Sequence, residues 1–332
     1  MPENGCDVVV VGASAGGVEA LRAFARALPA NFGAAVLIVL HVPATGASAL
    51  PQILTRDGPL AATHATDGEP LVPGRIFVAP PNNHLLVNGG RVELTRGPRE
   101  NGHRPAIDPL FRSAAAAYDS RVAGVVLSGT LDDGTAGLYE IKRRGGATLV
   151  QDPDEALYSA MPASAIAFVD PDHVLPTTEL VDVLVRLTAF TNGLQGTEGQ
   201  MPDQAPNPSA EDAQPGHRAP FSCPDCGGTL WSTQNGDLES YRCRVGHAFT
   251  EKALVGRHDE VVDRALWTAY RALEERAAMS HRLARRLRER GRAESASRFL
   301  RQAQESSRHA EELRRVLNVI DAPAEVEEPQ AS

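Results

Sequence analysis

The first 190 residues predict an α/β fold built on a parallel β-sheet that helices cover on both faces. Short runs of Val, Ile, Leu and Ala alternate with longer amphipathic stretches, which is the order of strand–helix–strand units. The apolar runs lack the polar alternation of half-exposed strands, so both faces of the sheet should be buried. Two later patterns, a Cys-rich stretch and a pair of amphipathic segments, predict a small metal-binding module and a helical hairpin.

The strands of this sheet are predicted from the apolar runs themselves. They fall at 8–11, 35–40, 75–79, 122–127 and 148–151. Gly12 opens a turn after the first strand, and a helix is predicted from about Val18 to Leu28. Open α/β sheets place their sites at the carboxyl ends of strands, so functional side chains are expected directly after these runs.

Three segments of different composition follow this domain. Residues 191–220 are rich in Gly, Pro, Gln, Asn, Ser and acids, which predicts a flexible linker. Residues 221–258 contain too few apolar groups to form a core without a metal or another cross-link. From 259 to 320, apolar or small residues recur at spacings of four and three, which predicts a helical hairpin or coiled coil broken near Gly291. The pattern leaves open whether this hairpin binds a regulatory protein, self-associates, inhibits the catalytic domain or is simply solvated.

Composition argues against nucleic-acid-binding, membrane and secreted proteins. The chain has 332 residues, of which 42% are hydrophobic and 23% charged, with a formal net charge of -9. The negative net charge argues against a nucleic-acid partner, because binding to the phosphate backbone rests on clustered Lys and Arg. No apolar run approaches the roughly 20 residues that span a bilayer, and no signal peptide precedes the first strand, so we expect a cytoplasmic protein without membrane insertion.

A serine on a tight turn is the first candidate for chemistry. Ser14 lies in the sequence GASAGG at 12–17, between the first strand and the first helix. The small neighbours give a substrate access, and backbone N–H groups at a helix N-terminus can stabilise an oxyanion. A phosphate-binding loop is the competing interpretation, although the spacing G-x-G-x-x-G is absent. The turn alone leaves both open.

A base and an acid are available at neighbouring strand ends. His41 follows the second predicted strand directly, where it could take a proton from Ser14. The strand at 122–127 is followed by Asp132 and Asp133, either of which could orient the histidine or simply cap a helix. An α/β-hydrolase fold is excluded because its serine follows several strands and its partners come in the order Ser, Asp, His.

The first 190 residues resemble the catalytic domain of the chemotaxis-receptor protein-glutamate methylesterases (CheB) across nearly the whole domain. The resemblance rests on VGASAGG at 11–17, HVP at 41–43, DGEPLVPGRIFVAPPNNH ending at 84, HRPAIDPLF at 103–111, LSGTLDDG at 127–134 and AMP at 160–162. It implies a doubly wound, Rossmann-like sheet. Its catalytic residues fall on Ser14, His41 and Asp133, since the family aspartate precedes a glycine.

The resemblance also implies further site residues. Backbone groups near Ala15 and Thr130 would be the oxyanion donors, although Thr130-Leu131 stands where the family has Met-Gly. His84, His103 and Arg104 are expected to shape the cleft.

The implied function is hydrolysis of glutamate γ-methyl esters on a methylated receptor, with deamidation of glutamine as a related activity and no cofactor for catalysis. Two alternatives remain: an esterase or amidase on another substrate, and a signalling scaffold with a vestigial triad. The chemotaxis enzymes carry a receiver domain before the esterase, whereas the first strand here begins at residue 8. Activation is therefore expected from another subunit, from the C-terminal region, or not at all.

The Cys-rich stretch has the spacing of a structural zinc site. Cys223 and Cys226 form C-x2-C, and Cys243 and His247 form C-x3-H sixteen residues later. Four such ligands fill a tetrahedral zinc ion, so the predicted metal is structural. The alternative is three unlinked thiols. Acidic and basic residues balance in this zinc-ribbon-like module, which favours a protein-binding role, and Trp231 and Phe249 are its candidate core.

Overall fold

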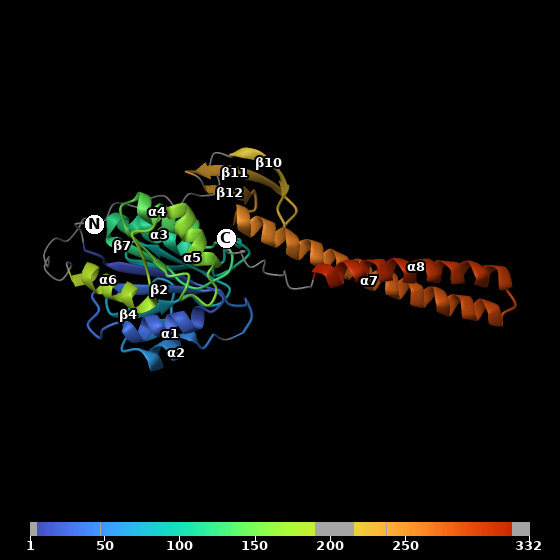
Figure 1. Cartoon of the computed structure of the whole chain (residues 1–332), viewed down its shortest axis with the longest axis horizontal. Coiled ribbons are helices and arrows are strands. Elements are labelled where there is room, and N and C mark those ends of the chain that lie inside the picture. Colours follow the sequence, from blue (N-terminus) through green and yellow to red (C-terminus); the bar gives the residue numbers. More distant parts are fainter. Residues whose placement is uncertain (1–4, 47, 190–215, 237, 321–332) are drawn as a thin grey trace, which may run out of the picture. The chain divides into compact units, whose positions relative to one another are not determined.

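The computed structural model describes residues 5–46, 48–189, 216–236 and 238–320 (Figure 1). The chain divides into two compact units, Met1–Gly256 and Arg257–Ser332. The first unit contains the predicted α/β domain and the Cys-rich module. The second contains most of the C-terminal helical segment.

A seven-stranded parallel sheet forms the centre of the α/β domain, as predicted. Its strands are β1 (Val8–Ala13), β2 (Ala35–Leu40), β3 (Ala61–His64), β4 (Arg75–Val78), β7 (Val122–Val126), β8 (Ala147–Gln151) and β9 (His173–Leu175). Their order is β3-β4-β2-β1-β7-β8-β9, and every neighbouring pair is parallel. The strands β1, β2, β7 and β8 are buried along their whole length, in agreement with their unbroken apolar sequences.

Helices cover both faces of this sheet (Figure 1). One face packs against α1 (Gly17–Ala27), α2 (Leu50–Asp57) and α6 (Thr177–Ala189), and the other against α3 (Ile107–Tyr118), α4 (Thr135–Arg143) and α5 (Ala160–Val169). Alternate β1 residues divide between these two cores: Val9 and Val11 enter the first, and Val8 and Val10 the second. This period-two division is what a strand buried on both faces requires.

The strand order places the end of β1 at a topological switch point. The chain leads from β1 to β2, which pairs with one edge of β1. It later returns to form β7, which pairs with the opposite edge of β1. Loops after β1, β2 and β7 therefore meet at one edge of the sheet. Between β4 and α3 the chain also forms an antiparallel hairpin, β5 (His84–Asn88) and β6 (Arg91–Thr95), which the apolar runs did not predict.

The Cys-rich segment forms a four-stranded antiparallel sheet, which we call the β-module (residues 217–250). Its strands are β10 (His217–Ser222), β11 (Thr229–Asn235), β12 (Leu238–Cys243) and β13 (Ala248–Thr250). Its small core includes Phe249, as predicted, whereas Trp231 is only half-buried. Most of the predicted linker lies outside the described residues, but its last residues, from His217 onward, belong to β10.

Two long helices form the C-terminal hairpin. They are α7 (Glu251–Glu289) and α8 (Ala293–Ile320), separated by a turn in which Gly291 has a φ of 71°. The helices end on either side of the predicted break, but α7 begins at Glu251 and not near 259. Small residues form the buried stripe of this unit: Ala277, Ser280, Ala284, Ala296, Ala303, Ser306 and Ala310. None of the described helices is long and apolar enough to span a membrane.

Candidate active site

Ser14 lies on the turn that joins β1 to α1. Its backbone N–H donates to the carbonyl oxygen of Ser128 (2.9 Å), which fixes the turn against the end of β7. Gly16, with a φ of 69°, precedes the first residue of α1, and a Cβ there would lie 2.7 Å from the Ser128 hydroxyl. The small residues are therefore required by the fold of this turn as well as by access to Ser14.

His41 follows β2 and points its ring between Ser14 and Asp133. Its Nε2–H donates to Asp133 Oδ2 at 2.7 Å, which leaves Nδ1 as the acceptor that faces Ser14 Oγ at 3.0 Å. The ring of His103 stacks on that of His41, with centroids 3.7 Å apart and planes inclined by 8°. Strand ends β1, β2 and β7 thus bring a hydroxyl, an imidazole and a carboxylate into one hydrogen-bonded line.

Asp133 is the acid that reaches His41, and four donors surround its buried carboxylate. Oδ2 accepts from His41 and from the Ile107 N–H (2.7 Å), and Oδ1 accepts from Asn101 Nδ2 (2.8 Å) and the Asp108 N–H (3.2 Å). Burial alone would raise the pKa of Asp133, but the hydrogen bond and the charge of His41 and the N–H of Ile107 lower it below its ordinary value. The carboxylate is therefore held ionised beside the imidazole.

The neighbouring Asp132 has a different environment. Its Oδ1 accepts a hydrogen bond from the Thr250 hydroxyl at 2.7 Å, and it makes no bond to His41 among the described residues. Burial raises the pKa of Asp132 to about 6, and the charge of Asp133 adds to this shift. The structure thus separates the two adjacent acids that the sequence left as alternatives.

Sequence reasoning missed two residues that hold Asp133. The Asn101 side-chain amide donates to Asp108 Oδ2 (2.9 Å) as well as to Asp133, and Asp108 Oδ1 accepts the N–H groups of Gly134 (3.1 Å) and Gly137 (2.7 Å). Burial and the Asp133 carboxylate together raise the pKa of Asp108. Asn101 stands in an Asn-Gly pair, which predicts only a turn, and Asp108 stands in the first turn of α3, where an acid is expected as a cap.

The remaining predicted cleft residues divide between the site and its support. His103 lies on His41, as described above. His84 is buried, and its ring contacts the Pro98 carbonyl (2.9 Å) and accepts the Ala106 N–H (3.3 Å). Arg104 donates to the side chain of Asn82 and to the carbonyls of residues 96 and 97. His84 and Arg104 therefore support the loops that lead to α3.

The predicted oxyanion donors lie beside the serine. Ala15 follows Ser14 directly, and Thr130 follows Gly129, where a Cβ would come within 2.9 Å of the Ser14 Cβ. The same Cβ would lie 2.2 Å from Met161 Sδ, so this close approach depends on glycine. Within the described part of the chain, the N–H groups of Ala15 and Thr130 donate to no other group.

The metal-ligand prediction concerns a second cluster, in the β-module. One ligand atom from each of Cys223, Cys226, Cys243 and His247 lies within 4.8 Å of all the others. Two tight turns bring the four atoms together, and glycines with positive φ close them: Gly227 after the first cysteine pair and Gly246 before the histidine.

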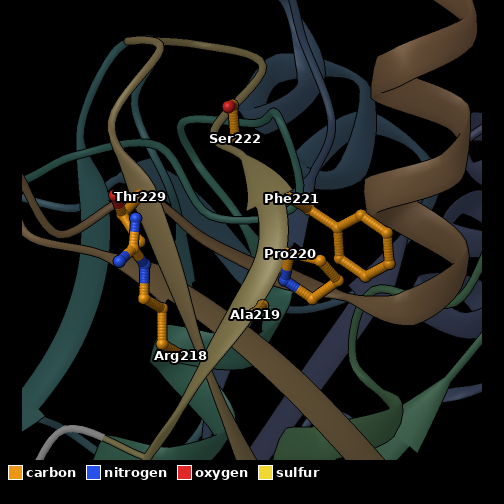
Figure 2. A pocket seen from close by; sticks show the side chains of 6 residues that line it. All are labelled: Arg218, Ala219, Pro220, Phe221, Ser222 and Thr229. Atoms are coloured by element: carbon orange, nitrogen blue, oxygen red, sulfur yellow. The ribbon is translucent and has the colours of Figure 1, made fainter.

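A shallow pocket elsewhere on the β-module has no connection with this chemistry. The hollow has a volume of about 340 Å³ and lies along β10. Figure 2 shows its lining residues, with Arg218 and Phe221 on opposite sides of the strand. Its lining contains neither a histidine nor a carboxylate that could serve as a base. The candidate site is therefore the strand-end cluster around Ser14.

Comparison with known proteins assigns the α/β domain. The family model of the CheB methylesterases matches residues 9–184, which is more than half of the chain. The chain belongs to the CheB methylesterase family. This match confirms the resemblance that the sequence motifs indicated.

Individual CheB relatives agree with this assignment. A protein from Leptospira interrogans is 36% identical over 182 residues, which cover 54% of this chain and 94% of that protein. Protein-glutamate methylesterase/protein-glutamine glutaminase 5 of Anaeromyxobacter dehalogenans is 42% identical over 184 residues, 54% of this chain and 51% of that protein. The crystal structure of the Thermotoga maritima CheB methylesterase catalytic domain matches with a TM-score of 0.53 and 33% sequence identity. The match covers 55% of this chain and 98% of the Thermotoga chain.

Proposed function

We propose that this CheB-family chain is a protein-glutamate methylesterase that hydrolyses glutamate γ-methyl esters of methylated receptors, with Ser14, His41 and Asp133 as its catalytic residues. The observation that carries the proposal is the hydrogen-bonded line from Ser14 Oγ through the His41 ring to Asp133. Family membership supplies the reaction class, and this geometry supplies a nucleophile, a base and an orienting acid.

The reaction follows from the direction of these hydrogen bonds. Ser14 Oγ attacks the ester carbonyl while its proton passes to His41 Nδ1, and Asp133 stabilises the imidazolium that results. The tetrahedral intermediate collapses as His41 returns the proton to the methoxide, so methanol leaves and an acyl-enzyme remains. Water then attacks the acyl group through the same base, which releases glutamate and restores Ser14. A glutamine amide would follow the same steps and release ammonia.

The developing oxyanion needs donors close to Ser14, and we assign this role to the N–H groups of Ala15 and Thr130. Both are uncommitted within the described residues, and Ala15 stands at the N-terminal end of α1, where the helix dipole favours negative charge. Removing one donor of this kind costs about 10²–10³ in rate in serine hydrolases.

Methanol release from membranes that contain methylated receptors tests the proposal. The full chain should release methanol, the Ser14→Ala variant should not, and the matched Ser159→Ala variant, which changes an exposed serine at the start of α5, should behave as the parent. Release from a small glutamate methyl ester without release from receptors would sink the receptor substrate but keep the esterase. No Ser14-dependent release from either substrate, with folding verified, would reject the enzyme.

We also propose that the β-module binds one structural zinc ion through Cys223, Cys226, Cys243 and His247. Zinc bonds of about 2.3 Å to sulfur and about 2.0–2.1 Å to nitrogen, arranged tetrahedrally, separate neighbouring ligands by roughly 3.5–3.8 Å. The Cys226 and Cys243 sulfurs lie 3.7 Å apart, and His247 Nδ1 lies 3.7 Å from the Cys223 sulfur and 3.5 Å from the Cys243 sulfur. These separations are the ones that a bound zinc ion requires.

Metal analysis of the purified full chain tests this site. We expect about one zinc per chain. The Cys243→Ser variant should lose it, whereas Cys6→Ser, which changes the buried cysteine just before β1, should retain it. Equal zinc content in both variants would contradict the assignment.

A further inference from the structure

The β-module packs against the loop that carries Asn101. The Asn101 N–H donates to the Ala248 carbonyl (2.8 Å), and the Ala248 N–H donates to the Arg99 carbonyl (3.4 Å), so residues 99–101 run beside β13 as a short additional strand. An ion pair between Arg242 and Glu100 (3.6 Å) lies along the same contact. Backbone pairing of this kind fixes the register between a loop and a sheet edge.

Thr250, the last residue of β13, makes two buried contacts with the surroundings of the site. Its N–H donates to Asn101 Oδ1 at 2.9 Å, and its hydroxyl donates to Asp132 Oδ1 at 2.7 Å. Thr250, Asn101 and Asp132 are each at most 4% exposed. These bonds therefore form in a region that excludes water, where each hydrogen bond is stronger and each unpaired group costs more.

The Thr250 N–H supports the direction in which the Asn101 amide points. With Oδ1 engaged by Thr250, the two hydrogens of Nδ2 face the carboxylates of Asp108 and Asp133. The reversed amide would place its oxygen against those two carboxylates and its NH₂ against the Thr250 N–H. All three hydrogen bonds would then be lost in a buried place, so the β-module adds to the two carboxylates in holding the orientation in which Asn101 donates to Asp133.

We propose that Asn101 and Thr250 are positioning residues through which the β-module, when its zinc site is filled, holds the catalytic aspartate. His247, a proposed zinc ligand, immediately precedes β13, and Cys243 ends β12, which pairs with β13. Metal binding would thus hold the residue that precedes β13 and the strand that pairs with β13. The residues of the β-module that bond Asn101 lie in β13 itself. The inference rests on the proposed function, because it concerns Asp133 as the acid that orients His41.

The rate at which a fluorophosphonate labels Ser14 tests this coupling. The probe reports the nucleophilicity of Ser14 without a receptor, since Oγ displaces fluoride from phosphorus. Relative to the zinc-loaded full chain, the chelated full chain should be labelled about 10- to 100-fold more slowly, the range expected when a catalytic group is misplaced. Hydrogen exchange should rise at the amides of 248–250 and 99–101 and stay slow in β1 and β2, which would show that the sheet remains folded.

Asn101→Ala identifies the route of the coupling. In the zinc-loaded chain this variant should label as slowly as the chelated parent while it retains zinc, and chelation should slow it no further, since effects through one residue are not additive. Ser240→Ala removes an exposed hydroxyl contact to Thr233 within the β-module and should label at the parent rate.

Three results would overturn the inference or its basis. Equal labelling of loaded and chelated chains, with exchange showing an opened β-module, would refute the coupling. A further slowing of Asn101→Ala on chelation would refute Asn101 as the route. No labelling of Ser14 in the zinc-loaded parent would refute the proposed function and the inference with it.

Discussion

Replacing Asp132 with asparagine should stabilise the protein near neutral pH. Asp132 is buried, receives one hydrogen bond from the Thr250 hydroxyl and lies beside the ionised Asp133. Lys252 attracts its charge and Glu251 opposes it, but burial dominates and raises its pKa from 3.8 to about 6. Asparagine keeps an acceptor for Thr250 and removes the charge that burial disfavours.

The sign and size of the effect follow from linkage. As the pH rises above 3.8 the unfolded state ionises first, so the parent loses stability until the pH passes about 6, where the folded state has also ionised. The accumulated penalty is about 1 kcal/mol at pH 4.5 and about 3 kcal/mol at pH 7.5. The advantage of Asp132→Asn over the parent should therefore grow by about 2 kcal/mol between these two pH values.

Urea unfolding of the full chain at both pH values, followed by circular dichroism, measures this change. Comparing variant with parent cancels the other titrating groups of the site, and Asp154→Asn, which changes an exposed acid, is the matched control. The reasoning fails if the advantage of Asp132→Asn is the same at pH 4.5 and pH 7.5, because Asp132 would then not titrate between them in the way its burial demands.

Three further outcomes are expected. Asp133→Asn replaces one carboxylate oxygen with an NH₂ group, which would face two of the four donors around this side chain. Methanol release should therefore fall about 10³–10⁴-fold while the zinc content stays unchanged. A loss of less than tenfold would contradict the role proposed for Asp133. Burial raises the pKa of Cys6 to about 12, so iodoacetamide at pH 8 should not alkylate it in the folded chain, whereas chelation should free the other three cysteines to react. Mass spectrometry of the modified peptides decides between these outcomes and their opposites. Ala303→Leu overfills the buried stripe of the hairpin and should cost about 1–3 kcal/mol in thermal unfolding, while Ser307→Leu, at an exposed position, should cost far less.

The sequence predicted the sheet well because its strands are buried on both faces. Unbroken apolar runs located β1, β2, β4, β7 and β8 within about two residues at either end. The edge strands β3 and β9 and the hairpin strand β6 escaped because they are short or partly exposed, and such segments have no distinctive apolar pattern. The other hairpin strand, β5, is mostly buried, but its apolar run is only Leu85 to Val87. The prediction was therefore most accurate where burial alone dictates the residue types.

The site was predictable only where its residues follow strands directly. Ser14 and His41 stand at strand ends, where topology brings side chains together. The choice between Asp132 and Asp133 needed the family motif, since both follow the same strand. Asn101 and Thr250 had no local signal, because they are 149 residues apart and meet only through the packing of the β-module on the domain.

These contacts bear on how the C-terminal region affects the enzyme. All four donors to Asp133 belong to the α/β domain, but one of them, the Asn101 amide, is itself held by Thr250, which lies beyond that domain. Removing the β-module would leave Asn101 without two of its hydrogen bonds and Asp132 without its buried donor. The contacts of this module therefore favour support of the proposed catalytic residues over their inhibition.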